Sequence, residues 1–224
     1  MKAPPFWWRS SPTLGARLLS PAGHLVGAIA MRRLARPPAV HLGIPVVCVG
    51  NPTVGGSGKT PVAIAIADAL ADAGHTPVFL TRGYGGRLRG PVCVAPHHSA
   101  VDVGDEPRLL AEKAPTVVAR DRAAGGQEAA RHGDVVVMDD GFQNPALAKD
   151  FSLLVLDAAV GLGNARVTPA GPLRAPFEAQ ARLADALILT QTGEASASMP
   201  DTTRPVHHVQ LLTTSPVPLA GIRV

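Results

Sequence analysis

The chain has 224 residues, of which 46% are hydrophobic and 17% are charged. That length predicts one or two domains, and the apolar content excludes an intrinsically disordered chain. Two cysteines, Cys48 and Cys93, are too few for a disulfide scaffold, and nothing near them has metal-ligand spacing.

Charge is unevenly distributed along the chain. The first 67 residues carry seven basic residues and no acidic one, whereas the remainder carries more acidic than basic residues. A basic segment of this kind predicts an anionic partner, either a nucleic acid or a membrane surface. Arg32, Arg33 and Arg36 are not interleaved with aromatic residues and precede no nucleic-acid motif, so we expect no nucleic-acid partner.

The N-terminal segment, residues 1–40, is predicted to be a helical element at a membrane interface. Its uncharged run, residues 18–31, contains Pro21 and is shorter than the roughly 20 apolar residues that a bilayer-spanning helix needs. Trp7 and Trp8 suit the headgroup level, and the arginines suit anionic lipid. One alternative is a helix docked on the core. The other is a signal peptide, because the run ends in small residues that resemble a cleavage site.

A glycine-rich loop carries the clearest chemical signal. Residues 44–50 are an apolar run predicted to be a buried strand, and residues 61–73 are Ala-rich with helical spacing. Glycines between a strand and a helix let backbone amides approach phosphate groups closely. In such a loop Lys59 would reach the β- and γ-phosphates, and the Thr60 hydroxyl would bind Mg²⁺. The predicted nucleotide-binding residues are Thr53, Val54, Gly55, Gly56, Ser57, Gly58, Lys59 and Thr60.

The strict phosphate-loop pattern has glycine where this chain has Thr53, so an ordinary glycine-rich turn is the alternative. Strands and helices alternate through the rest of the chain. The predicted strands are 76–81, 116–119, 134–138, 151–156 and 186–190, and the predicted helices are 106–114, 123–132 and 177–183. This order predicts an α/β fold: a P-loop NTPase-like, mostly parallel sheet with helices on both faces, preceded by an N-terminal amphipathic helix. Residues 41–191 would form this core, and the Ser/Thr/Pro-rich residues 192–205 would form a linker.

Acidic residues follow or precede several of these elements. The apolar strand ending at residue 138 leads directly into Asp139 and Asp140, where carboxylates hold Mg²⁺ in nucleotide folds. The alternative is a polar strand end that caps the next turn. Asp105 opens a predicted helix, and its position in the pattern favours an N-cap over a catalytic base.

Three arginines occupy positions from which a guanidinium group can clamp phosphate in a bidentate manner. Arg82 follows a strand, Arg122 lies at a helix start, and Arg174 ends a Pro- and Gly-rich segment. Surface solvation is the alternative for each of them.

Together these motifs resemble one family over roughly residues 5–220. They are VGNPTVGGSGKTP (49–61), TRGYGG (81–86), GDEP (104–107), DR (121–122), DDGFQ (139–143) and PAGPLR (169–174). In this order and at this spacing they resemble tetraacyldisaccharide 4′-kinase, the lipid A kinase of Gram-negative bacteria, whose own loop is similar at Thr53.

The resemblance implies transfer of the γ-phosphoryl group of ATP, with Mg²⁺, to the 4′-hydroxyl of a tetraacylated glucosamine disaccharide 1-phosphate, giving lipid IVA. It implies catalytic roles for Lys59, Asp105 and Arg174, with Arg122 also near the phosphates. It implies metal binding by Thr60, Asp139 and Asp140. The partners would be an anionic glycolipid and the cytoplasmic face of the bacterial inner membrane, with no obligate protein partner.

The sequence departs from the family pattern at three points. Ala175 stands where the family commonly has Glu, and Asn144 stands where it usually has His. Family members are about a hundred residues longer, so we expect residues 192–224 to be a linker and the start of a C-terminal part that includes a supporting His. A P-loop GTPase and a non-catalytic nucleotide-binding fragment are the rival functions. Residues 190–193 lack the Lys and Asp of a guanine-reading motif, which argues against the GTPase.

Overall fold

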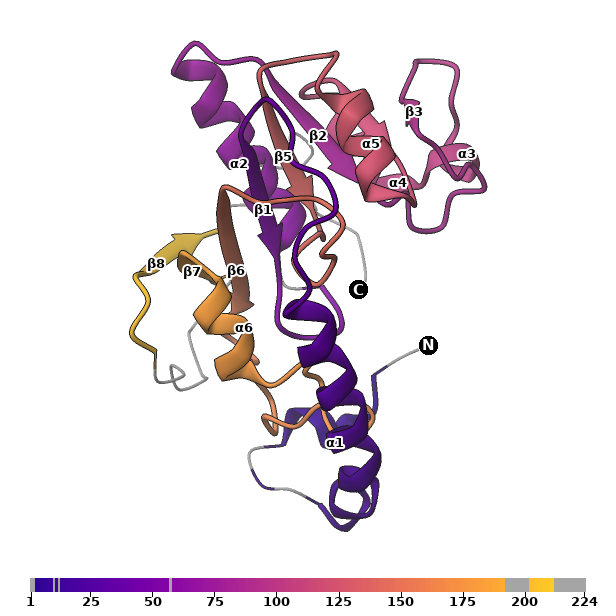
Figure 1. The fold of residues 1–224 in the computed structure, drawn as a ribbon. Helices are drawn as coiled ribbons and strands as arrows, with labels where there is room; N and C mark the ends of the chain where they lie inside the picture. Colours follow the sequence, from indigo (N-terminus) through magenta and orange to yellow (C-terminus); the bar gives the residue numbers. More distant parts are fainter. Residues whose placement is uncertain (1–2, 10, 12, 57, 192–201, 212–224) are drawn as a thin grey trace, which may run out of the picture.

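The structure, a computed structural model, describes residues 3–9, 11, 13–56, 58–191 and 202–211. Its centre is an eight-stranded sheet in the order β3-β4-β2-β5-β1-β6-β7-β8, parallel except that β3 is antiparallel to β4 (Figure 1). The strands are β1 (Val46–Gly50), β2 (Pro77–Thr81), β3 (Val92–Cys93), β4 (Thr116–Val118), β5 (Val135–Asp139), β6 (Phe151–Asp157), β7 (Ala186–Gln191) and β8 (Val206–Gln210). The helices are the 3-10 helix η1 (Pro5–Trp8) and α1 (Leu14–Leu34), α2 (Lys59–Asp72), α3 (Ala100–Val103), α4 (Asp105–Ala111), α5 (Arg122–Ala129) and α6 (Phe177–Leu183).

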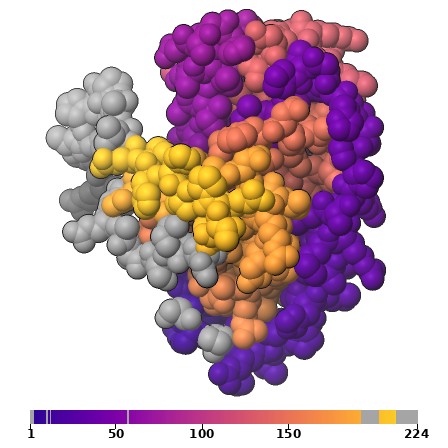
Figure 2. Space-filling model, turned by 60° about the vertical axis from the view of Figure 1, so that its left-hand side comes forward, coloured from indigo at the N-terminus to yellow at the C-terminus, as the bar shows by residue number. Residues whose placement is uncertain are grey.

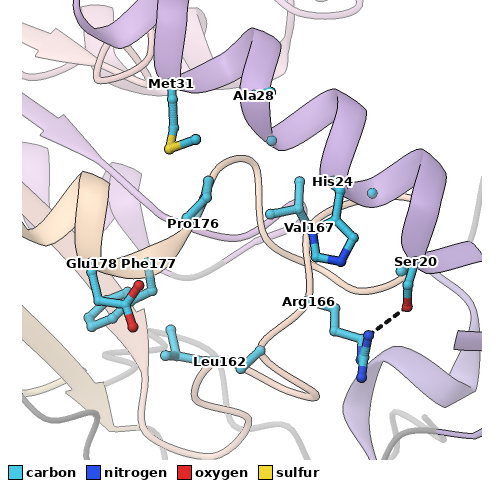
Figure 3. A pocket seen from close by; sticks show the side chains of 14 residues that line it. Ser20, His24, Ala28, Met31, Leu162, Arg166, Val167, Pro176, Phe177 and Glu178 are labelled. Carbon is cyan, nitrogen blue, oxygen red and sulfur yellow. Dashed lines mark hydrogen bonds between the residues drawn. The ribbon is translucent and has the colours of Figure 1, made fainter. Parts of the chain in front are cut away.

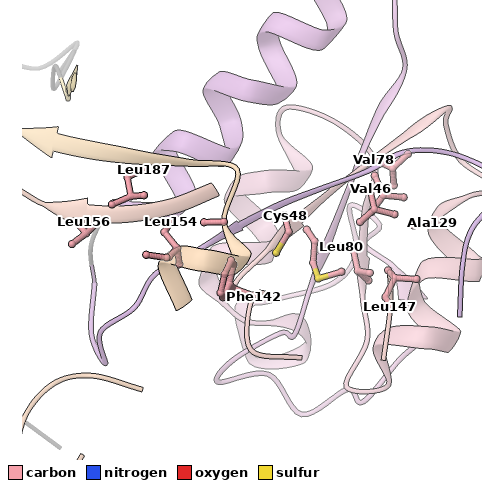
Figure 4. Packing of buried hydrophobic residues seen from close by; sticks show 14 of the residues in the cluster. Val46, Cys48, Val78, Leu80, Ala129, Phe142, Leu147, Leu154, Leu156 and Leu187 are labelled. Atoms are coloured by element: carbon pink, nitrogen blue, oxygen red, sulfur yellow. The ribbon is translucent and has the colours of Figure 1, made fainter. Parts of the chain in front are cut away.

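The central strands of this parallel sheet are covered on both faces, because helical crossovers between parallel strands lie on the sheet. β1 and β5 are continuous apolar runs rich in valine, which is the pattern of parallel strands buried on two sides. α2 and α4 contribute to the apolar cluster on one face of the sheet, and α5 and α6 contribute to the cluster on the other. Figure 4 shows this second cluster, which includes Val46, Leu80 and Phe142. The predicted fold class is confirmed.

Every strand and helix predicted between residues 44 and 191 is present, with ends at most three residues from the predicted ones. η1, β3, α3 and β8 were not predicted. The first three are too short to show a periodicity. β8 is an edge strand on the surface of the molecule (Figure 2). Most of its side chains are exposed, so it lacks the continuous apolar run that predicted the other strands. Most of the predicted linker, residues 192–201, lies outside the described residues.

The predicted N-terminal helix is present as α1, which extends past the sheet toward one end of the molecule (Figure 1). Thr13 caps it by accepting a hydrogen bond from the Ala16 amide. The helix continues through Pro21 and outlasts the uncharged run at both ends. Within the described residues, α1 is therefore the one helix long and apolar enough to cross a membrane, by length and composition alone.

The side chains on the two faces of α1 differ in size and in exposure to solvent. Small residues, Ala16, Gly23 and Gly27, are buried against the protein. Leucine and isoleucine side chains on the other side are exposed; they are Leu14, Leu18, Leu25 and Ile29. A cavity of about 450 Å³ remains between α1 and the segment 162–178, and Figure 3 shows Arg166 donating a hydrogen bond to Ser20 at one end of it.

One expectation for the N-terminal segment is wrong. Trp7 does not lie at a headgroup level, because it is only 8% exposed and its indole Nε1 donates a hydrogen bond to the Pro169 carbonyl at 3.0 Å. A buried indole needs such a partner for its N–H group. Trp8 is exposed, as expected.

Candidate active site

The glycine-rich loop follows β1, between the ends of β5 and β6, as parallel α/β sheets place their ligand sites. Gly58 is the N-cap of α2 and has φ +76°, a left-handed conformation that favours glycine. Asn51 braces the loop, since its side-chain amide donates a hydrogen bond to the Gly55 carbonyl at 3.2 Å. Gly55 and Gly56 are exposed, so their backbone is open to a ligand. Ser57 lies outside the described residues.

The predicted metal residues meet at the start of α2. The Thr60 hydroxyl donates a hydrogen bond to Asp139 Oδ2 at 3.1 Å. Lys59 Nζ lies 3.9 Å from Asp140 Oδ1. Asp140, immediately after β5, has φ +54°, a left-handed backbone conformation that is uncommon for residues other than glycine. The alternative of a strand end that caps the next turn does not fit Asp139, which is 1% exposed and whose carboxylate accepts from the Thr60 hydroxyl.

Burial gives Asp139 unusual acid–base behaviour. Desolvation raises the pKa of its carboxyl to about 6, although the nearby Lys59 ammonium acts in the opposite direction. The Glu106 carboxylate adds to the increase, which places the start of α4 toward this site. Asp139 Oδ1 is buried and has no hydrogen-bond partner within the described part of the chain. An unpartnered carboxylate oxygen beside a threonine hydroxyl and a second aspartate is a donor set that Mg²⁺ prefers.

Arg174 is attached to the loop by its backbone and by its side chain. Its amide donates to the Pro52 carbonyl at 2.8 Å, and its Nε donates to the Thr53 carbonyl at 2.9 Å. Its Nη1 lies 3.1 Å from Asp140 Oδ1. Surface solvation is therefore excluded for Arg174, whose guanidinium group and the Lys59 ammonium share one carboxylate.

Arg122 lies under the site and does not point into it. Its side chain is 3% exposed, and its guanidinium donates to the Ala119 carbonyl at 3.0 Å and to the Asp139 carbonyl at 3.4 Å. Burial lowers the pKa of this guanidinium, and the Asp140 carboxylate offsets part of that effect. Arg122 thus anchors the turn that carries the two aspartates. Arg82 is exposed at the end of β2.

Asp105 is the first residue of α4 and is exposed. The N-cap interpretation is wrong, because Gly104 occupies the cap position and no side chain caps the helix. The Asp105 carboxylate makes no ion pair or hydrogen bond with another described residue, so it is available to a ligand.

A pair of glutamines, the buried Gln180 and the half-buried Gln143, connects these parts and was not predicted from the sequence to be functional. The Gln143 amide donates to the Asn51 carbonyl at 2.8 Å and to Gln180 Oε1 at 2.9 Å. The Gln180 amide donates to the Ala175 carbonyl at 2.7 Å and to the Pro52 carbonyl at 3.3 Å. Gln180 is 0% exposed, and it shares the buried face of α6 with Phe177. The sequence did contain one signal for Gln180: it is a polar residue at helical spacing on the otherwise apolar face of α6.

We expect replacement of Gln180 by leucine to destabilise the loop. The substitution leaves the Gln143 amide and the Pro52 and Ala175 carbonyls with fewer partners in a buried place, which costs about 1–3 kcal/mol of unfolding free energy. Urea denaturation measures this loss, and titration with ATP is expected to show weaker binding. Gln127→Leu, at an exposed position on α5, is the matched control and should change neither value. Equal stability of the two variants would contradict this account.

The chain is similar to one family in sequence and in structure. The profile of a family described as tetraacyldisaccharide-1-P 4′-kinase, LpxK, matches residues 15–221. Proteins named tetraacyldisaccharide 4′-kinase from Methylobacterium sp. (strain 4-46) and Nitrobacter hamburgensis are each 57% identical to it, over 89% and 88% of this chain and 60% and 58% of their own lengths. The crystal structure of LpxK from Aquifex aeolicus in complex with ATP has a TM-score of 0.74 and 32% identity, covering 86% of this chain and 64% of that chain. The chain thus spans about 60% of the length of the curated relatives it matches.

Proposed function

The chain belongs to the tetraacyldisaccharide-1-P 4′-kinase family, and we propose from this premise that it transfers the γ-phosphoryl group of ATP to the 4′-hydroxyl of a tetraacylated glucosamine disaccharide 1-phosphate. The product would be lipid IVA. The observation that carries the proposal is the convergence of Lys59, Asp140 and Arg174 beside the phosphate loop. The Lys59 ammonium and the Arg174 guanidinium lie together beside the phosphate loop, where they can stabilise the negative charge of a transferred phosphoryl group.

The loop and its surroundings fit ATP and Mg²⁺. Residues 53–60 supply the glycine backbone and the α2 N-terminus that bind phosphates. Thr60, Asp139 and Asp140 supply oxygen ligands, and the buried, unpartnered Oδ1 of Asp139 supports a cation there. Held by these residues, Mg²⁺ would neutralise negative charge on the phosphate oxygens. Ala175 is buried and its side chain offers no ligand atom, so Thr60, Asp139 and Asp140 are the proposed ligands.

Each residue of the site has a separate role in the reaction. Asp105 accepts the proton of the sugar hydroxyl as that oxygen bonds to phosphorus and the bond to the β-phosphate oxygen breaks. Lys59 and Arg174, which both lie near Asp140 Oδ1, stabilise the charge on the transferred group. Gln143 and Gln180 hold the loop in register with Arg174 without touching the reactants.

A direct assay tests the proposal. The purified protein is incubated with Mg²⁺, ATP and the acyl disaccharide 1-phosphate in detergent micelles, and the 4′-phosphorylated product is measured by mass spectrometry. Asp105→Ala is expected to lower turnover by about 10²–10⁴-fold, since it removes the base. GTP competition is expected to be weak; the residues that argued against a guanine site, 190–193, lie partly outside the described residues. ATP binding without product would overturn the kinase proposal and support a nucleotide-binding chain without chemistry.

We also propose that residues 1–40 hold the protein at the cytoplasmic face of the bacterial inner membrane, ahead of a P-loop kinase core over 41–191. The exposed leucine and isoleucine side chains of α1 supply apolar area, and the last turn of α1 carries Arg32 and Arg33. Because surface attraction is screened by salt, we expect recovery in the membrane fraction at low salt and partial release at about 1 M salt.

Leu18→Asp and Leu25→Asp together should move the protein to the soluble fraction, because they place charge on the apolar side of α1. The matched control, Val101→Asp with Leu109→Asp, changes exposed apolar residues away from α1 and should leave the distribution unchanged. Full solubility of the unaltered protein at low salt would contradict membrane attachment.

A further inference from the structure

An arginine-lined cavity lies where the end of α1 meets the start of α5. Its volume is about 410 Å³, within the range of about 300–1,000 Å³ that small-molecule sites occupy. Arg33 and Arg36 line it from the end of α1, and Arg120 and Arg122 line it from the connection between β4 and α5. It is on the α5 face of the sheet, opposite the face that α2 covers.

The charges around this cavity are not balanced by the protein. The side chains of Arg33, Arg36 and Arg120 make no ion pair or hydrogen bond with any residue that the structure describes. The one carboxylate in the lining, Asp121, is already engaged, because its Oδ1 accepts from the amides of Ala123 and Ala124. Like charges gathered around a concave surface repel one another unless an anion lies between them.

The fourth arginine connects the cavity to the site of chemistry. Arg122 forms part of its lining, and the same guanidinium contacts the Asp139 and Asp140 carbonyls at 3.4 and 3.5 Å. A ligand in the cavity is therefore separated from the two aspartates by the length of one side chain. Asn144 also lines the cavity and follows the same turn, with its side-chain oxygen accepting from the Ala146 amide.

We propose that this cavity binds the 1-phosphate of the acceptor disaccharide. Three unpaired guanidinium groups suit a phosphate monoester, whose oxygens accept several charge-assisted hydrogen bonds at once. The α2 N-terminus suits the phosphates of ATP, so a second anion site, linked to the two aspartates through Arg122, serves the other substrate. Its place at the end of α1 is where a lipid-borne sugar arrives from a membrane surface. This inference rests on the proposed function for the identity of the acceptor.

Vesicle binding in the absence of ATP tests it. Phosphatidylcholine vesicles carrying the acyl disaccharide 1-phosphate are compared with vesicles carrying the same disaccharide without its 1-phosphate, matched in charge with phosphatidylglycerol. We expect the protein to prefer the first vesicles by about tenfold or more, because the guanidinium groups form charge-assisted bonds to that phosphate. Arg36→Gln with Arg120→Gln should abolish the preference. Arg9→Gln with Arg17→Gln removes the same charge elsewhere in the N-terminal half and should weaken binding to both vesicles while keeping the preference.

The outcomes separate the possible anions. Equal loss of binding to both vesicles in the Arg36/Arg120 variant would mean attraction to any anionic lipid surface and would overturn the inference. Abolition of the preference by millimolar inorganic phosphate would mean a free-phosphate site and would also overturn it. An inactive protein that keeps the preference would support the inference while overturning the kinase proposal, so the two failures are distinguishable.

Discussion

Replacing Lys59 by alanine is expected to lower phosphoryl transfer by about 10²–10³-fold, the usual cost of removing one preorganised group that stabilises transition-state charge. Lys59 is the first residue of α2 and lies 3.9 Å from Asp140 Oδ1, at the point where the loop meets the paired aspartates. We expect the loss mainly in kcat, because the interaction strengthens as charge moves to the transferred group.

Stability should change little in this variant. The ion pair with Asp140 is partly open to solvent, and pairs of that kind contribute roughly 0–1 kcal/mol. Lys113→Ala, an exposed lysine after α4, is the matched control for loss of one positive charge. Turnover is measured with the acyl disaccharide acceptor, and melting temperature is measured alongside it. Turnover within a factor of about three of the unaltered protein would remove Lys59 from the mechanism.

Asp139→Asn is expected to abolish transfer and, without metal, to stabilise the fold. Burial raises the pKa of Asp139 to about 6, whereas an unfolded aspartate has a pKa near 3.9. Between these values the folded protein binds more protons than the unfolded chain, so the free energy of unfolding falls as pH rises toward 6 and is then constant. Asparagine has no such charge to bury. At pH 8 without Mg²⁺ the variant should therefore be about 1–3 kcal/mol more stable than the unaltered protein.

The pH dependence identifies the cause. The stability difference should shrink between pH 6 and pH 4, because Asp139 is protonated there in the folded protein. Asp72→Asn, an exposed aspartate at the end of α2, should show no such difference. Chemical denaturation at pH 4.5 and pH 8 measures both variants. A stability difference that is the same at both pH values would refute the desolvation account.

Local patterns in the sequence were sufficient for the fold and for much of the site. Apolar runs without alternation predicted the central strands, since a parallel sheet buries both faces of each strand. The loop, Lys59, Thr60, Asp139, Asp140 and Arg174 were predicted from motifs, and the structure brings them together. Asp105 stays a prediction, since the structure leaves its carboxylate exposed and free of contacts among the described residues.

Features that depend on contacts between residues far apart in the chain could not be predicted from the sequence. The Gln143–Gln180 hydrogen bond joins positions 37 residues apart, and neither residue has a neighbour in sequence that indicates the other. Trp7 gave a wrong expectation because its partner, Pro169, is 162 residues away. Tertiary contacts decided each of these cases.

The short segment 164–174 has contacts at both ends that link the N-terminus to the phosphate loop. The Asn164 amide donates to the Trp7 carbonyl at 2.7 Å, and the Trp7 indole donates to Pro169. Farther along, the Val54 amide donates to the Pro172 carbonyl at 2.7 Å, and Arg174 donates to the Pro52 and Thr53 carbonyls. The eleven residues of this segment therefore connect η1 to the phosphate loop, and we expect any displacement of η1 to shift the position of that loop.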